Sequence, residues 1–311
     1  MIDKGLSFTA LSLAAVLWLA GCGSVASSGD TESLSERSES YLYDGTGSVS
    51  EEPIPADMAY PYNSSAFVLN DVGDMTYTDT ASYTYRDGID VSSYCGDIDW
   101  NAVRNAGYEF VFIRIGYRGY ESGQICEDEK FEEYYSGAVT AGLDVGVYFF
   151  SQAVDESEAA EEADFVRDTL NGRALQLPAA IDIEQADDEN VRTDGMSGDE
   201  FTANVLAYSS AIRKAGYEPL VYTNLYGQTF MLNMHKLDGI PIWFSGFDAV
   251  PNTEYTFDYW QYSSTGTVDG IIGNADLDIQ MIPAGENTSD NSDTSMVPVE
   301  DASEEQTLVG Q

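Results

Sequence analysis

Between residues 88 and 283, short apolar runs alternate with segments of helical spacing, and this alternation limits the possible folds more than any other feature. Eight runs have the length and composition of strands. They cover residues 88–92, 110–116, 143–151, 179–184, 218–224, 239–247, 257–263 and 271–279. Four segments of helical spacing lie between the earlier runs, at residues 98–107, 128–142, 155–170 and 197–216. Glycine ends three of these segments, as is common after helices.

Strands that alternate with helices indicate a parallel sheet covered by helices. Eight strands in fewer than 200 residues, with little helix between the last ones, predict an α/β fold: an irregular TIM-like β/α barrel with reduced late helices. An open, doubly wound sheet is the alternative. No glycine-rich phosphate loop follows the first strand, which argues against a nucleotide-binding fold of that kind. In barrels, functional side chains lie at the C-terminal ends of the strands.

Composition divides the chain into four parts. Residues 1–21 form a predicted lipoprotein signal peptide, residues 22–87 a flexible tether rich in Ser, Gly, Asp and Glu, residues 88–283 the folded domain, and residues 284–311 a disordered acidic tail. The formal net charge of the 311 residues is −41. A polyanion of this kind lacks the Lys and Arg clusters that nucleic-acid phosphates require, so we expect no nucleic-acid partner.

The N-terminus carries a targeting signal. An apolar run from Leu6 to Leu19 is followed by Ala20, Gly21 and Cys22. The run is too short for a mature membrane-spanning helix. The Leu-Ala-Gly-Cys sequence resembles a bacterial lipobox, which implies cleavage before Cys22, lipidation of its thiol and a lipid anchor at the extracellular face of the cell membrane. An ordinary signal peptide with a fortuitous cysteine is the alternative.

Few residues of the domain suit thiol, metal or histidine chemistry. Cys95 and Cys126 can form a disulfide outside the cell, with two free thiols as the alternative. A metal site would need more ligands, and His235 is the only histidine of the chain. No nucleophile motif accompanies His235, so we expect neither a metal, a cofactor nor a catalytic triad.

The ends of the predicted strands are rich in acids and aromatic residues. The acids are Asp90, Asp182, Glu184, Asp276 and Asp278. The candidates for substrate contacts are Arg114, Tyr117, Phe150, Tyr222, Asn224, Trp243, Trp260, Gln261 and, among the acids, Asp278. Any one of these has an ordinary explanation, since a strand-end acid often caps a helix and a tryptophan often belongs to the core. Their occurrence at successive strand ends favours a shared site.

Asp182 and Glu184 point to this site most directly. Residues i and i+2 of a strand share one face, about 6.6 Å apart along it. Two carboxylates in a poorly solvated site resist joint ionisation, so at least one pKa is expected to rise. A neutral carboxylic acid beside an ionised one can cleave a glycosidic bond, because one protonates the leaving oxygen while the other stabilises positive charge on the sugar.

Residues 88–283 resemble glycoside hydrolase family 25, the lysozyme family that cleaves N-acetylmuramyl bonds of peptidoglycan. The motifs that carry the resemblance are "GIDVSSY…IDW", "FVFIRIGYRGY", "EDEKF", "AGLDVGVYFFSQA", "DIE", "AGYEPLVYTN", "PIWFSGF" and "WQYSSTGTVDGIIGNADLD". The resemblance covers nearly the whole domain, in order and with the family's spacing. It implies an irregular β/α barrel with a substrate groove over the C-terminal strand ends.

The resemblance also implies roles for the acids. Glu184 corresponds to the general acid, and Asp182 to the group that stabilises the charged sugar or orients its acetamido group. Asp90 and Asp276 would hold this set and its hydrogen bonds. Asp278 departs from the family pattern, where Asn is common, and we expect its charge to raise the pKa of Asp276. Phe247 replaces a tyrosine and lacks a hydroxyl that could bind sugar.

We therefore expect a monomeric, membrane-anchored muramidase that needs no cofactor and acts on peptidoglycan glycan strands. A lipoprotein that binds wall glycan without cutting it is the main alternative. A solute-binding lipoprotein of a transporter is a second one, although that fold usually has two lobes and more residues.

Overall fold

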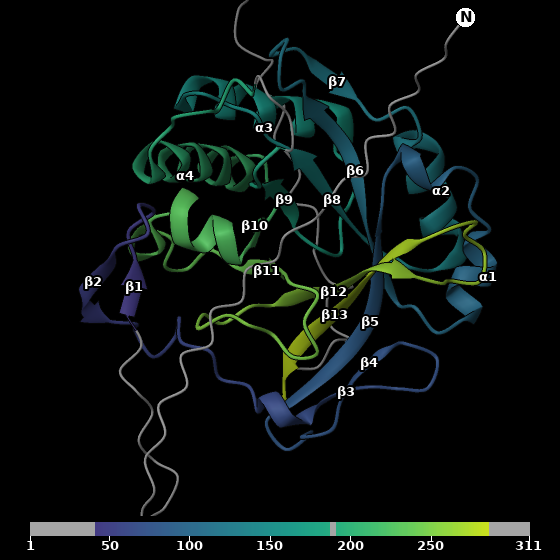
Figure 1. Ribbon diagram of the computed structural model, residues 1–311. Coiled ribbons are helices and arrows are strands. Elements are labelled where there is room, and N and C mark those ends of the chain that lie inside the picture. Colours follow the sequence, from purple (N-terminus) through teal and green to yellow (C-terminus); the bar gives the residue numbers. More distant parts are fainter. Residues whose placement is uncertain (1–40, 187–190, 286–311) are drawn as a thin grey trace, which may run out of the picture. The chain divides into compact units, whose positions relative to one another are not determined.

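The structure is a computed structural model that describes residues 41–186 and 191–285. Within these residues, eight strands form the closed barrel that the sequence predicts (Figure 1). In chain order they are β5 (Tyr83–Val91), β6 (Phe110–Arg118), β8 (Asp144–Phe150), β9 (Ala179–Asp182), β10 (Pro219–Asn224), β11 (Ile242–Ser245), β12 (Tyr259–Gly266) and β13 (Ala275–Pro283). Pairing of β5 with both β6 and β13 closes the ring.

Seven of these strands run parallel, and β13 runs against both of its neighbours. The sequence alone had suggested a parallel strand over 271–279, and that expectation is wrong in direction. The short turn between β12 and β13 leaves no room for a crossover helix, which a parallel pair would need. One consequence concerns Asp276, which pairs with Asp90 at the start of β13 and so lies at the same barrel mouth.

Four helices cover the first half of the barrel. They are α1 (Trp100–Asn105), α2 (Phe131–Ala141), α3 (Glu156–Leu170) and α4 (Gly198–Lys214), close to the predicted segments. Asp99 and Asp155 cap α1 and α3, and Ser197 forms a capping box with Glu200 at α4. In Figure 1, α3 and α4 lie side by side on one flank of the barrel, while α1 and α2 contact each other on another.

The later connections of the barrel are short, as predicted. A π-helix, η3 (Gly227–Met231), and a 3₁₀ helix, η4 (Met234–Lys236), follow β10. No described helix follows β11 or β12. The mouth on this side is therefore bordered by loops, which leaves the carboxyl ends of β11 and β12 accessible to a ligand.

Two apolar clusters hold these layers together. The larger one fills the space between strands and helices and includes Val111, Ile113 and Val205. The smaller one fills the barrel interior, where Phe112 stacks on Trp243 with ring centroids 4.4 Å apart. This interior cluster closes the barrel below the mouth, so the barrel has a packed floor and is not a pore.

The predicted flexible tether over 22–87 is wrong for residues 41–87. These residues form two hairpins and lead into β5: β1 (Tyr41–Tyr43), β2 (Val49–Pro53), η1 (Ser64–Ala66), β3 (Phe67–Leu69) and β4 (Met75–Tyr77). Apolar side chains in this polar segment are buried, including Leu42, Tyr62 and Met75, and the ring of Tyr62 packs 4.6 Å from that of Phe257. Residues 1–40 and 286–311 lie outside the described residues, and with them Cys22, the signal peptide and most of the tail. No helix in the part of the chain that the structure describes is long and apolar enough to cross a membrane.

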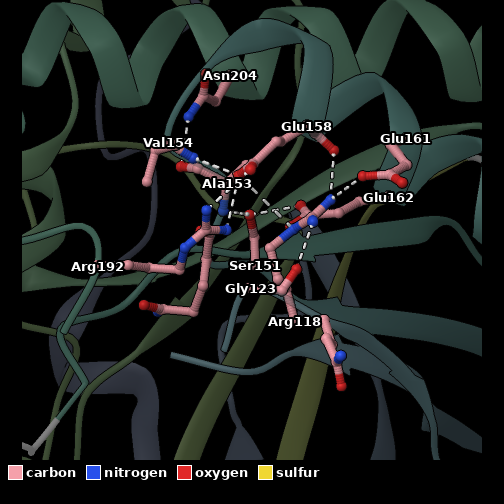
Figure 2. Close-up of polar contacts among 12 residues, drawn as sticks. Arg118, Gly123, Ser151, Ala153, Val154, Glu158, Glu161, Glu162, Arg192 and Asn204 are labelled. Carbon is pink, nitrogen blue, oxygen red and sulfur yellow. Dashed lines mark hydrogen bonds and ion pairs between the residues drawn. The ribbon is translucent and has the colours of Figure 1, made fainter. Parts of the chain in front are cut away.

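A buried polar network fixes the loop that follows β8. Arg118, at the end of β6, donates to Glu162 Oε1 at 2.7 Å, and Ser151 Oγ donates to the other oxygen of Glu162 at 2.6 Å (Figure 2). Arg192 binds Glu158 through the two terminal nitrogens of its guanidinium, at 2.7 and 2.8 Å. These bonds tie β6, α3 and the loops at Ser151 and Arg192 into one unit beside the mouth.

Candidate active site

A cavity of ≈ 240 Å³ opens at the carboxyl ends of the barrel strands. It is lined by Asp90, Tyr148, Asp182, Glu184, Tyr222, Trp243, Phe247, Gln261, Ser264 and Asp276. The four carboxylates to which the sequence assigned catalysis therefore share one cavity. None of its lining residues carries a positive charge.

Strand geometry brings Asp182 and Glu184 into this cavity. Asp182 is the last residue of β9, and Glu184 follows two residues later. Ile183 lies between them and is buried in the core on the opposite side, with its N–H bonded to the carbonyl of Tyr222. The alternation of the chain thus continues past the end of β9 and presents both carboxylates to the mouth.

Gln261 is the hydrogen-bonding centre of the cavity. Its Nε2 donates to Asp90 Oδ2 at 2.6 Å, while its Oε1 accepts from the hydroxyls of Tyr222 and Ser245, both at 2.9 Å. The two hydroxyl donors fix which end of the amide faces Asp90. Gln261 therefore orients Asp90, and three strands, β10, β11 and β12, hold Gln261 in place.

Asp278 lies below the cavity and is fully buried in the barrel floor. Its Oδ1 accepts from Trp243 Nε1 at 2.8 Å. Among the described residues no donor reaches its Oδ2, and its carboxyl interacts with that of Asp90. A proton on either of these two carboxyl groups would satisfy the contact. Asp278 therefore supports the cavity from below and does not line it, contrary to the predicted substrate contact.

The pKa values of the cavity carboxyls all lie above their ordinary values. Burial is the first cause at Asp90 and Asp182, whose pKa values lie well above normal, and the charges of Asp276 and Glu184, respectively, add to it. Burial and the charge of Asp276 raise the pKa of Glu184. Burial raises the pKa of Asp276 to about 6, and the repulsion expected between Asp276 and Asp278 adds to the effect of burial in raising the pKa of Asp278. Desolvated like charges cannot all ionise, so these groups share protons.

Such a set can act as acid and base without a metal ion. A protonated carboxyl can donate to a leaving oxygen while a neighbouring carboxylate stabilises positive charge. In the described ranges 41–186 and 191–285, no group of three or more His, Cys, Asp or Glu residues is arranged to hold a metal ion.

Six predicted substrate contacts, Asp278 among them, lie outside the cavity lining. Arg114 Nε binds Asp128 at 2.7 Å, and Tyr117 packs against Arg114 beside the mouth. Asn224 accepts from the N–H of Gly227 and so caps the turn after β10. Trp260 packs against Phe67 on the outside of the barrel, because its neighbour Gln261 faces inward and adjacent strand residues face opposite ways.

Phe150 was predicted to contact the substrate, but Tyr148 lines the cavity and Phe150 does not. Both belong to β8 and face the same way, but only Tyr148 lies low enough to line the cavity. Phe247 and Ser264 also line it and were not predicted as contacts. Phe247 ends a predicted strand, so its position was recognisable. Ser264 lies in the extension of β12 beyond the predicted run, where the sequence carries no apolar signal.

The disulfide considered between Cys95 and Cys126 is not formed, and both thiols are free. Cys95 belongs to the 3₁₀ helix η2 (Ser93–Cys95) after β5, whereas Cys126 belongs to β7 (Ile125–Glu127), which pairs with the outer end of β6. Cys126 faces Tyr117 across this pair. The two cysteines thus lie in different elements, and their side chains have different neighbours.

A larger cavity of ≈ 340 Å³ lies at the opposite end of β11, between residues 57–58 and the segment from Met234 to Ile242. Its walls are mostly apolar, and Asp57, Asp238 and Asp258 are exposed at its rim. Size alone would favour this cavity. The convergence of buried carboxyls with raised pKa values favours the smaller one as the reactive site.

A closed β/α barrel with acidic side chains at the C-terminal ends of its strands has the architecture and the site position of barrel enzymes. Residues 89–271 match the family described as "Glycosyl hydrolases family 25". The chain belongs to this family.

Three similar proteins illustrate the match. The autolytic lysozyme of Clostridium acetobutylicum is 32% identical over 193 residues, which cover 61% of this chain and 54% of that protein. Lysozyme M1 of Streptomyces globisporus is 27% identical over 199 residues, covering 61% and 65%. The chain thus spans about half to two thirds of the length of these curated relatives. The crystal structure of the bacterial lysozyme from Streptomyces coelicolor has a TM-score of 0.53 and 25% identity, and covers 64% of this chain and 92% of that one.

Proposed function

We propose that this protein is a peptidoglycan hydrolase, a muramidase that cleaves the β-1,4 bond between N-acetylmuramic acid and N-acetylglucosamine. Membership of family 25 and similarity to proteins named lysozymes support this function. The observation that carries it is the cavity in which Asp90, Asp182, Glu184 and Asp276 converge without a cation among the lining residues.

Glu184 is the proton donor in this mechanism. It is less buried than Asp182, lies just past the end of β9 at the mouth, and has a pKa raised by burial and by Asp276. A glutamic acid with a raised pKa keeps its proton to higher pH than an ordinary glutamic acid and can protonate the oxygen of the leaving sugar. Asp182, two residues earlier and deeper, faces the positive charge that develops on the other sugar.

Asp90 and Asp276 position this pair. They face each other across the β5–β13 ladder, and Gln261 holds Asp90 in a fixed orientation. Trp243, Tyr148 and Tyr222 provide apolar ring faces beneath the carboxyls, which suits the C–H faces of a sugar ring. The arrangement thus combines charge stabilisation with a shaped, largely desolvated cavity.

The products of wall digestion test the proposal. Purified peptidoglycan is incubated with the full chain, the fragments are reduced with borohydride, and mass spectrometry identifies the reduced end. We expect reduced N-acetylmuramic acid at the new ends. Reduced N-acetylglucosamine would assign a different bond. Binding without any new ends would favour the non-catalytic glycan-binding alternative, and cleavage of chitin in place of wall glycan would assign another substrate.

We also propose that the protein is anchored at the extracellular face of the cell membrane through a lipid on Cys22. The lipobox-like sequence before Cys22 supports this. In cells expressing the full chain, labelled fatty acid should enter the wild-type protein but not the Cys22→Ser variant. Labelling that is equal in both would contradict the anchor.

A further inference from the structure

An exposed aromatic ring stands beside the candidate active site without a role in it. Tyr94 belongs to η2, which directly follows β5, the strand that carries Asp90. Its side chain is 89% exposed. A single exposed aromatic residue is common on protein surfaces and implies nothing by itself. The contacts that hold the ring of Tyr94 in place are what point to a role.

Arg114 supports the ring of Tyr94 from below. Its guanidinium carbon lies 5.0 Å from the ring centroid of Tyr94 and 5.4 Å from that of Tyr117. Asp128 holds the guanidinium at 2.7 Å, and Arg114 also donates to Ser93 Oγ at 3.2 Å. The guanidinium, itself held by Asp128, thus lies over one face of the Tyr94 ring, while nearly all of the ring's surface remains open to solvent.

The platform of Tyr94, Arg114 and Tyr117 adjoins the cavity. Arg114 is close enough to Asp182 to offset part of the rise in its pKa, which is caused first by burial and then by Glu184. Tyr148, a lining residue, is a further electrostatic neighbour of Arg114. The platform therefore lies where β5 and β6 meet the mouth.

A second exposed ring lies on the other side of the same mouth. Phe247 follows β11, lines the cavity and is 59% exposed. In the ring of eight strands, β11 is four strands away in either direction from β6, which carries Arg114 and Tyr117, and three strands in one direction and five in the other from β5, which leads to Tyr94. The platform and Phe247 consequently stand on opposite sides of the mouth that the cavity carboxyls line.

We propose that a glycan strand crosses the mouth from the platform to Phe247, and that Tyr94 binds a sugar ring next to the one held in the cavity. The inference rests on the proposed function, since it concerns the path of the same substrate. A cavity of ≈ 240 Å³ is smaller than pockets that enclose a whole drug-sized ligand, so a longer glycan must extend over the rim. The open face of Tyr94 offers the C–H face of a sugar an apolar, electron-rich surface.

Steady-state kinetics of the full chain on long glycan strands and on the shortest cleaved oligosaccharide test this path. Tyr94→Ala should raise KM for long strands about 5- to 10-fold, the size of one aromatic contact, with kcat unchanged. The shortest substrate, which does not reach the platform, should show no change. Tyr94→Phe keeps the ring and should restore the wild-type KM on both substrates.

Tyr135 provides a matched control. On α2, its ring lies 5.2 Å from the guanidinium of Arg173, a contact of the same kind away from the mouth. Tyr135→Ala should leave KM for long strands unchanged, and melting curves verify that both variants fold. An unchanged KM for long strands in Tyr94→Ala, or an equal loss on both substrates, would overturn the proposed path. Absence of cleavage by the wild type would overturn the proposed function instead, and sedimentation with wall glycan would then show whether Tyr94→Ala weakens binding, as the platform requires.

Discussion

Two buried carboxyl groups of this barrel are equally inaccessible but have opposite surroundings. Glu162, on α3, accepts hydrogen bonds from Arg118 and Ser151, and its pKa, raised by burial, reaches about 7 (Figure 2). Asp278, in the barrel floor, accepts one bond from Trp243 and otherwise meets the acids Asp90 and Asp276, and its pKa is raised well above normal, by burial first.

The difference separates two clusters. The first is the structural network of Glu162, Arg118 and Ser151, and the second is the reactive set of cavity carboxyls with Asp278 beneath it. In the network around Glu162, the carboxylates are paired with arginines and hold loops in place. This role does not require them to donate or accept a proton. Among the described residues no cation forms an ion pair with the cavity carboxyls, and Arg114 offsets only part of the burial-driven rise in the pKa of Asp182, so these groups retain protons at a cost to stability, as is typical of functional sites. The comparison predicts that damage to the first cluster lowers stability, while damage to the second lowers activity.

The largest expected effect is on catalysis. Glu184→Gln should reduce kcat on wall glycan by roughly 1,000-fold or more, because an amide cannot replace the proton donor and general acid catalysis contributes up to about 10⁴-fold. The release of reducing ends measures the rate. Glu218→Gln, at an exposed glutamate before β10, is the matched control and should keep the wild-type rate. Substantial activity in Glu184→Gln would remove Glu184 from the mechanism.

The next effect is on stability. Arg118→Met should lower the free energy of unfolding by about 3–5 kcal/mol, because it leaves Glu162 buried without its cation. Chemical denaturation measures the loss, and kcat per folded molecule should stay near the wild-type value. Arg167→Met breaks exposed ion pairs with Asp164 and Asp168 and should cost less than about 1 kcal/mol. A loss of kcat as large as that of Glu184→Gln would erase the distinction between the clusters.

A smaller effect is expected at Gln261. Gln261→Leu removes the donor to Asp90 Oδ2 and leaves that buried oxygen unpaired, which should reduce kcat/KM about 10- to 100-fold. Trp260→Phe, on the neighbouring residue that faces outward, should leave kcat/KM within about 3-fold, since it removes the bond to the carbonyl of Gly246 and some packing outside the barrel but none of the side-chain bonds of Gln261. Equal losses in both variants would argue against a positioning role for Gln261.

The raised pKa values of the cavity carboxyls should make stability depend on pH. The cavity carboxyls have higher pKa values in the folded state than unfolded, so the folded protein binds more protons above about pH 4. The free energy of unfolding should therefore fall as pH rises from about 4 through the raised pKa values, with Asp276 contributing up to about 6. Melting temperatures should be higher at pH 5 than at pH 7. Asp278→Asn should weaken this slope, and an unchanged slope would show that Asp278 does not retain its proton.

The sequence predicted the parts of this structure that local pattern determines. The strand and helix alternation gave the barrel, and the spacing of Asp182 and Glu184 placed both at the mouth. The sequence could also have shown that Trp260 and Gln261 of β12 do not both face the barrel interior, because adjacent residues of a strand point to opposite sides. The direction of β13 and the packing of residues 41–87 depend on contacts between distant segments, such as Tyr62 with Phe257. Local pattern does not encode such contacts.

The central claim is that the cavity carboxyls share protons because no cation of the described residues forms an ion pair with them. The pH dependence of kcat/KM on wall glycan tests it most directly. The account predicts a bell-shaped profile whose alkaline limb lies above the ordinary pKa of a glutamate, about 4.3, and moves when Asp276→Asn removes the neighbouring charge from Glu184. An alkaline limb at the ordinary value, or one that Asp276→Asn leaves in place, would contradict it.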